Sequence, residues 1–251
     1  MPKFFIRNSQ IDNNYIKIIG EDVNHIANVL RMKLEDEIQV CDIDTSQNYI
    51  VKLSNIQKDE IECEILKKIE SEAESPININ IFQGIPKSDK MELIIQKSTE
   101  LGVKQVTPVQ MERCISKING KDEKKKIERW QKISEVAAKQ SGRDIIPKIN
   151  NVEKITDICN SINDYDMIIV PYEKEEHYLL KSAIEELKIF NKKNPSIGIV
   201  IGPEGGFEYA EIELLKQSGA KIVTLGKRIL RTETVALAMA SVIMYELGGS
   251  I

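Results

Sequence analysis

Two glycine-containing turns near the C-terminus carry the residues best suited to chemistry. The first, Gly202–Phe207, follows a β-branched run and holds Glu204; the second, Leu225–Thr234, holds Arg231 and Glu233. A carboxylate can accept a proton, and a guanidinium stays charged and can stabilise negative charge that develops on an oxygen. Three glycines within five residues of the first turn let main-chain groups approach a ligand closely. The sequence therefore predicts a site that combines main-chain binding groups with acid–base residues.

The elements before these turns place both turns at one edge of a sheet. Ile197–Ile201 and Ile222–Leu225 are short apolar runs typical of buried strands, so each turn leaves the carboxyl end of a strand. In an open α/β sheet, ligands bind at that edge. From Pro76 onward, strands and helices alternate, which predicts a parallel sheet covered on both faces. The other expected strands are 78–83, 106–110 and 167–170, and the expected helices are 89–101, 124–140 and 235–247. Asp89, with Glu92 three residues on, predicts a capping box at the start of the first of these helices.

The first 70 or so residues show a different pattern. Short alternating segments predict the strands of a small β-barrel, at 4–7, 15–19, 37–41, 48–53 and 61–66. Asp22–Arg31 is the exception, because its apolar residues recur at helical spacing behind a possible Asp22 cap. The charged stretch Lys67–Ser75 is a plausible linker. We therefore expect two domains, residues 1–72 and residues 73–251.

Composition narrows the class of protein. The chain has 251 residues, of which 41% are hydrophobic and 29% charged, as in an ordinary packed protein. Its N-terminus lacks the apolar core of a signal peptide, and its four cysteines form no Cys-x-x-Cys pair, so we expect a reduced, cytoplasmic protein without a membrane span. Two histidines and scattered cysteines offer no cluster for a metal, and we expect none.

The charge distribution suggests a nucleic-acid partner. The net charge is −4 overall, but residues 76–150 carry 15 Lys and Arg against 9 Asp and Glu. A phosphate backbone responds to local potential, so this basic region could hold RNA. A solvated helix face explains part of it equally well.

The two turns also carry a family resemblance. Gly-Pro-Glu-Gly-Gly-Phe at 202–207, followed by Leu-Gly-x-x-Ile-Leu-Arg-x-Glu-Thr at 225–234, resembles the 16S ribosomal RNA (uracil-N3) methyltransferases of the SPOUT superfamily. Upstream, His25-x-x-x-Val-Leu-Arg-Met, Lys97-x-x-Glu-Leu-Gly-Val and Gln140-Ser-x-Arg match too. One departure is Glu35-Asp36, where such chains often place Gly before the strand at Ile38.

The resemblance implies a fold and a cofactor. The expected fold is α/β, with a C-terminal SPOUT-type parallel sheet containing a trefoil knot, preceded by a small PUA-like RNA-binding β-barrel. S-adenosyl-L-methionine is the implied cofactor, held by Ile201, Gly202, Pro203, Leu225, Gly226, Ile229, Leu230 and Thr232. Without the resemblance, two tight turns that pack apolar residues beneath a helix would be the better interpretation.

The implied acceptor is N3 of a uracil in 16S ribosomal RNA within the 30S subunit. N3 must lose its proton to become nucleophilic, so Arg231 could stabilise charge on a uracil oxygen and Glu204 or Glu233 could accept the proton. Glu204 could instead bond loop amides, and Glu233 could cap the start of a helix. The candidates for RNA contact are Arg7, Arg31, Lys33, Lys97, Arg113 and Arg143, although any single exposed cation is usually solvated.

The last expected helix is apolar almost all round. Val235–Leu247 needs partners on several faces and is too short for a membrane span. It is either a core helix or a homodimer interface, and the resemblance favours the dimer.

Two other functions compete with methyl transfer. A phosphate-binding α/β enzyme would use Gly202–Gly206 as an anion cradle, but this turn lacks the Lys-Ser/Thr pair usual in such loops. The other alternative is an RNA-binding protein without catalysis, which predicts that the wild type binds RNA and leaves it unmodified.

Overall fold

The computed structural model describes residues 1–70, 73–118, 120–189 and 192–248. The chain forms two compact units, one comprising Met1–Glu74 with Ala138–Ile146, and the other Ser75–Ala137 with Pro147–Ile251. The sequence predicted a division after residue 72, which itself lies outside the described residues. It did not predict that Ala138–Ile146 belongs with the N-terminal unit.

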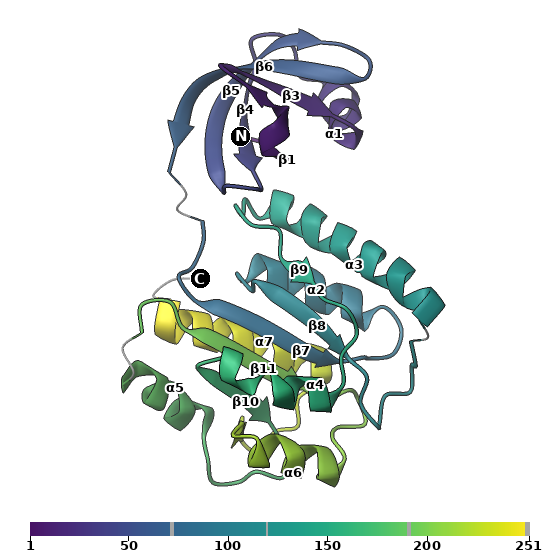
Figure 1. The fold of residues 1–251 in the computed structure, drawn as a ribbon, viewed down its shortest axis with the longest axis vertical. Helices are drawn as coiled ribbons and strands as arrows, with labels where there is room; N and C mark the ends of the chain where they lie inside the picture. The colour runs from purple at the N-terminus through teal and green to yellow at the C-terminus, as the bar shows by residue number, and fades with distance from the viewer. Residues whose placement is uncertain (71–72, 119, 190–191, 249–251) are drawn as a thin grey trace. The chain divides into compact units, whose positions relative to one another are not determined.

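The described part of the N-terminal unit contains a curled six-stranded sheet that forms a half-barrel (Figure 1). Its strand order is β1-β4-β5-β6-β3-β2, with β1 and β4 parallel and the other neighbours antiparallel. Alternate residues such as Ile16 and Ile18 are buried in its core. The strands are β1 (Lys3–Ile6), β2 (Ile11–Asp12), β3 (Tyr15–Ile19), β4 (Glu37–Asp42), β5 (Gln47–Ile56) and β6 (Glu60–Ile69), with a 3₁₀ turn, η1 (Asn8–Gln10), after β1.

A short helical segment between β3 and β4 differs from its prediction. It consists of α1 (Glu21–Asn24) and a π-helical turn, η2 (His25–Val29). The predicted Asp22 cap is wrong, because Gly20 precedes the helix and the Asp22 carboxylate instead accepts a hydrogen bond from Lys139 Nζ at 2.9 Å. In the next turn Glu35 has φ = 75°, so a glutamate adopts the left-handed conformation that glycine would ordinarily supply.

The described part of the C-terminal unit contains a six-stranded, wholly parallel sheet in the order β12-β10-β11-β7-β8-β9. All five strands predicted for this region are present, and the two-residue β9 was not predicted. β7 and β11 lie side by side at its centre. The strands are β7 (Asn78–Gly84), β8 (Gln105–Val109), β9 (Lys148–Ile149), β10 (Met167–Pro171), β11 (Ser196–Ile201) and β12 (Lys221–Val223).

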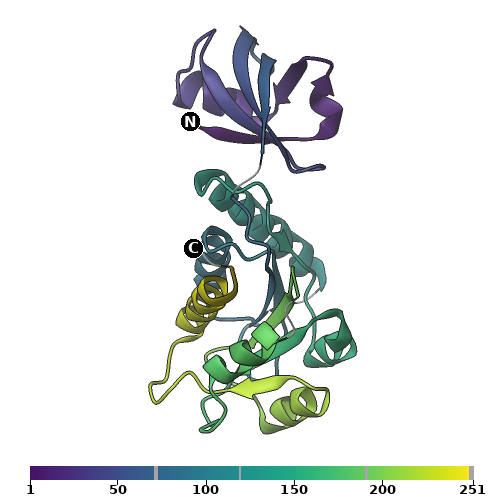
Figure 2. The ribbon, with the colours of Figure 1, turned by 90° about the vertical axis from the view of Figure 1, so that its left-hand side faces the viewer.

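Helices cover both faces of this sheet (Figure 2). One core packs α2, α3, α5 and α7 against one face, and a second packs α4 and α6 against the other. The central strands face both cores, as Ile81 of β7 lies in the first and Phe82 in the second. The helices are α2 (Lys90–Glu100), α3 (Gly120–Gln140), α4 (Ile155–Asn160), α5 (Leu180–Ile189), α6 (Tyr209–Gln217) and α7 (Thr232–Ile243), with short turns η3 (Ile162–Asp164) and η4 (Met244–Gly248).

One local prediction is wrong, and the predicted linker differs from the structure at its start. The capping box expected from Asp89 and Glu92 does not form, because the Asp89 side chain makes no cap hydrogen bond and Glu92 pairs with Arg129 at 2.5 Å. The expected linker begins inside β6, which runs to Ile69. Among the described residues, no helix has both the length and the apolar character that crossing a membrane requires.

Candidate functional site

The first glycine-containing turn leaves the buried carboxyl end of β11. Its Gly206 N–H donates to the Pro203 carbonyl at 2.9 Å, which closes the turn, and Gly206 has φ = 69°. A Cβ on Gly202 would lie 3.2 Å from the buried Phe207 ring. Glycine at 206 therefore suits the backbone conformation, and glycine at 202 avoids crowding the Phe207 ring.

The second turn leads from β12 to α7. Gly226 has φ = 102°, which allows the chain to reverse after Thr224. The Gly226 N–H donates to Thr224 Oγ1 at 3.2 Å, and the Val235 N–H donates to the Arg231 carbonyl at 2.9 Å as α7 begins. Ile229, near the tip, is 86% exposed.

A buried hydrogen-bond relay joins the two turns. Gln83, at the end of β7, donates from Nε2 to Thr232 Oγ1 at 2.8 Å, and the Thr232 hydroxyl donates to the Gly202 carbonyl at 2.7 Å. Gly84 supports the same region, because a Cβ there would lie 2.7 Å from the Pro203 ring. The relay joins Gly202 and Thr232, which are 30 residues apart in sequence, and so holds the two turns side by side.

The turns enclose a cavity of about 500 Å³. All the residues predicted to hold the cofactor line it, as do Glu204 and Arg231. Glu233 does not line it. The lining also contains polar and charged side chains that the sequence did not assign to the site, among them Lys90, Tyr172, Glu173 and Arg228. The position of Tyr172 and Glu173 directly after strand β10, at the same carboxyl edge, was the signal that would have identified them.

Charged groups at the cavity are paired across three elements. Lys90 Nζ lies 2.9 Å from Glu204 Oε1 and 3.4 Å from Glu233 Oε2. Burial opposes ionisation of Glu204, but the bond from Lys90 and the main-chain N–H groups outweigh it and hold the pKa of Glu204 below its ordinary value. The same bond from Glu204 raises the pKa of Lys90. The guanidinium of Arg231 pairs with none of the residues that the structure describes.

The predicted RNA-contact residues fall into three environments. Arg31 and Lys33 are exposed, and Arg7 is exposed beside Asp44 at 3.3 Å. Lys97 pairs with Glu100 at 2.8 Å on the surface of α2.

Arg113 stabilises the first glycine-containing turn through hydrogen bonds. Its Nε donates to Glu208 at 2.8 Å and its guanidinium also donates to the Gly205 carbonyl at 3.1 Å.

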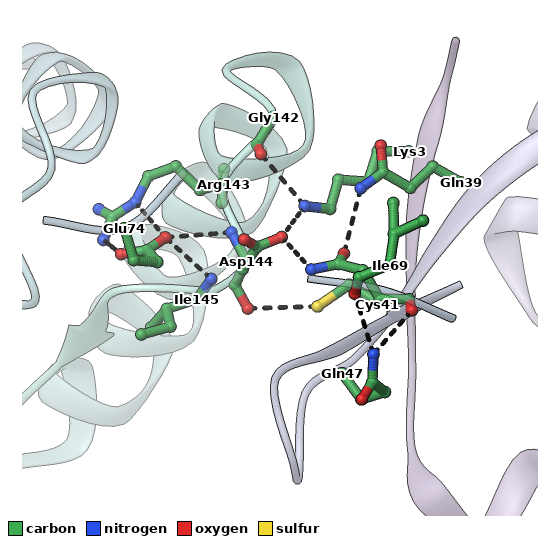
Figure 3. Close-up of polar contacts among 12 residues, drawn as sticks. Lys3, Gln39, Cys41, Gln47, Ile69, Glu74, Gly142, Arg143, Asp144 and Ile145 are labelled. Atoms are coloured by element: carbon green, nitrogen blue, oxygen red, sulfur yellow. Dashed lines mark hydrogen bonds and ion pairs between the residues drawn. The ribbon is translucent and has the colours of Figure 1, made fainter. Parts of the chain in front are cut away.

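Arg143 lies in a buried polar cluster of the N-terminal unit (Figure 3). Its side chain is 3% exposed, and its guanidinium makes two bonds to Glu74, at 3.1 and 2.7 Å. Asp144 beside it accepts bonds from Lys3 and, at 2.7 Å, from Asn48. The structure thus gives Arg143 a structural contact where the sequence suggested an RNA contact.

Comparisons with known proteins identify both units. Residues 73–244 match the family model of the RNA methyltransferase domain, and residues 18–66 match that of the RNA methyltransferase PUA domain. The ribosomal RNA small subunit methyltransferase E of Bacillus subtilis is 38% identical over 249 residues, which cover 98% of this chain and 97% of that protein.

Solved structures agree with these matches. The ribosomal RNA small subunit methyltransferase E of Neisseria gonorrhoeae, bound to S-adenosyl methionine, is 30% identical with a TM-score of 0.85 and covers 99% of each chain. A methyltransferase of Legionella pneumophila, in complex with the bound cofactor SAM, is 27% identical with a TM-score of 0.84, covering 97% of this chain and 96% of that one.

The parallel sheet, the cavity at its carboxyl edge and the matched domains define an RNA methyltransferase with an N-terminal PUA domain. The similarity to the relative from Bacillus subtilis extends over nearly the whole chain. The chain belongs to the ribosomal RNA small subunit methyltransferase E family.

Proposed function

We propose that this protein is an S-adenosyl-L-methionine-dependent methyltransferase that methylates N3 of a specific uridine in 16S ribosomal RNA of the small subunit. The observation that carries the proposal is the cavity between the two glycine-containing turns, lined by the predicted binding residues together with Arg231 and Glu204. The relatives named above act on small-subunit ribosomal RNA by name, and two structural neighbours contain the cofactor.

The cavity suits a ligand of nucleoside size. Its volume of about 500 Å³ lies within the range of ordinary small-molecule sites. The buried Ile201 and Pro203 and the half-buried Leu225 and Leu230 supply apolar contacts for an adenine ring, and the glycines expose main-chain groups for the ribose. When bound there, S-adenosylmethionine supplies an electrophilic methyl group on a sulfonium. No metal is required for this chemistry.

The charged residues of the site act on the uracil. Arg231 has an exposed guanidinium at the cavity, so it can stabilise the negative charge that develops on a uracil oxygen as N3 loses its proton. Glu204 and Glu233 are the candidates for proton acceptor. Glu204 lines the cavity and is held ionised, as a proton acceptor must be.

RNA contact requires exposed cations. Arg7, Arg31 and Lys33 on the N-terminal unit and Lys97 and Arg113 on the C-terminal unit are the proposed contacts, because each is at least partly exposed. A base within folded RNA would have to turn out of its stack to reach the cavity. We leave Arg143 out of this set, because Glu74 occupies its guanidinium.

The remaining features follow from the same proposal. The C-terminal sheet would adopt the SPOUT arrangement, with the two turns forming a trefoil knot. In α7 and η4, Val242 is 41% and Tyr245 66% exposed while Met239 and Ile243 are buried, so a second copy could cover the outer face and form a homodimer. Action on the 30S subunit would place the protein in the cytoplasm.

A methyl-transfer assay tests the proposal. The purified protein is incubated with labelled cofactor and small ribosomal subunits that lack the modification, and the methylated nucleoside is identified by mass spectrometry. N3-methyluridine in 16S RNA is the expected product. Absence of incorporation, together with absence of cofactor binding by calorimetry, would refute the proposal.

An Arg231→Ala variant separates catalysis from binding. We expect the variant to retain RNA binding and lose methyl transfer by about a hundredfold, the scale of one transition-state donor. Full activity in the variant would remove Arg231 from the mechanism. If the wild type binds RNA but leaves it unmodified, the protein is an RNA-binding protein without catalysis.

A further inference from the structure

Lys90 is the first residue of α2 and has no role in the scheme above. Its ammonium reaches two carboxylates from different elements, Glu204 in the turn after β11 at 2.9 Å and Glu233 in the first turn of α7 at 3.4 Å. Lys90 also lines the cavity. A single cation therefore connects α2, the first turn and α7 at the edge of the site.

The two carboxylates differ in what surrounds them. Glu204 lines the cavity, and its oxygens also accept the main-chain N–H of Lys87 at 3.2 and 3.3 Å. Glu233 does not line the cavity, its side chain is 16% exposed, and its Oε2 is buried without a hydrogen bond among the described residues. Lys90 Nζ thus lies closer to Glu204, at 2.9 Å, than to Glu233, at 3.4 Å, and Glu204 is the largest cause of the raised pKa of Lys90.

We propose that Lys90 is a positioning residue that holds Glu204 at the cavity in its ionised form, that Glu233 anchors Lys90 from behind, and that Glu204 alone takes the N3 proton. The inference rests on the proposed function and deepens it. The N3–H proton passes to the Glu204 carboxylate, the N3 electron pair forms the bond to the methyl carbon, and the electron pair of the broken S–C bond stays on sulfur. Charge and atoms balance without a further reactant.

Electrostatics supports this division of roles. Without Lys90, Glu204 would keep the burial that raises its pKa and lose the bond that lowers it, so its pKa would rise and its ionised fraction at acid pH would fall. Other charged or titratable groups face the same place from neighbouring elements. They are Glu173 after β10, Cys114 after β8, and Arg228 and Arg231 before α7.

The test compares Lys90→Met, Lys90→Arg and a charge-matched control, Lys216→Met, which removes an exposed cation from α6. Single-turnover methyl transfer to unmodified small subunits is measured from about pH 5.5 to about pH 9, with cofactor and RNA affinities measured separately. For Lys90→Met we expect the acid limb of kcat to move to higher pH than in the wild type, so that kcat falls most at the acid end of this range, while KM stays within about twofold. Lys90→Arg should restore most of the rate, and Lys216→Met should keep the wild-type profile.

The outcomes separate this inference from the proposed function. If the wild type transfers no methyl group, the function itself is wrong. If the wild type is active and Lys90→Met retains its kcat and pH profile, the function stands and the role of Lys90 is wrong. If Lys90→Met raises KM and weakens cofactor binding but leaves kcat unchanged, Lys90 has a structural role only. The same follows if Lys90→Arg fails to restore the rate.

Two further variants test the assignment of the proton acceptor. Glu204→Gln should abolish transfer at every pH, because an amide cannot take the proton. Glu233→Gln should shift the pH profile in the same direction as Lys90→Met and keep part of the rate. The reverse pattern would assign the acceptor role to Glu233 and overturn the proposal.

Discussion

The tightest packing constraint on the site lies at Gly84, the last residue of β7. A Cβ at this position would lie 2.7 Å from both Pro203 Cδ and Pro203 N, and 2.9 Å from Met111 Sδ. A methionine end can move aside, but a proline ring and its main-chain nitrogen cannot. In Gly84→Ala the first turn must therefore retreat by about 0.7 Å, the difference between 2.7 Å and an ordinary contact of 3.4 Å.

That retreat has two measurable consequences. Overpacking of this kind costs about 1 to 3 kcal/mol of folding free energy, which lowers the melting temperature by about 2 to 10 °C for a chain of this length. A displacement approaching 1 Å in a binding turn can lower the rate of catalysis by up to about a hundredfold. Because Pro203 lines the cavity, we also expect weaker cofactor binding by calorimetry.

The control makes the same chemical change where there is room. Gly120, the first residue of α3, has no atom within 4 Å of the position that an added Cβ would take and no positive φ, so Gly120→Ala should leave melting temperature and activity close to wild type. If Gly84→Ala behaved like this control in thermal unfolding, cofactor affinity and methyl transfer, the reasoning about the Pro203 contact would be refuted.

Two other predictions concern reactivity and stability. Burial raises the pKa of the Cys63 thiol to about 12, so this thiol stays protonated at about pH 8.5. Iodoacetamide should therefore label the partly exposed Cys159 well before Cys63. Equal labelling of the two cysteines, measured by mass spectrometry, would contradict this. Arg143→Met should lower the free energy of unfolding by about 3 to 5 kcal/mol in denaturant unfolding, because it leaves the Glu74 carboxylate without its guanidinium partner. A decrease below about 1 kcal/mol would mean that the pair is weakly coupled.

Most elements of the C-terminal sheet were predictable because their signals are local. Ile197–Ile201 and the glycines after it lie within one stretch of chain, so β-branched residues and positive-φ positions mark the strand and the turn directly. The segment at Asp22 was harder to predict from the sequence. Asp22 resembles a helix cap in sequence, but its carboxylate pairs with Lys139, more than a hundred residues away. The ion pair with Lys139 therefore outweighed the local preference of Asp22 for a helix cap.

The sequence by itself determined the two glycine-containing turns, the strands that precede them and the family resemblance, because backbone conformation and residue periodicity are properties of neighbouring residues. Only the tertiary structure decided that Lys90 joins Glu204 to Glu233 at the cavity, that Gln83 connects the turns through Thr232, and that Arg143 is buried against Glu74. These contacts join residues that are far apart along the chain. Their existence depends on which side chains packing brings within a few ångströms, and no local pattern records that.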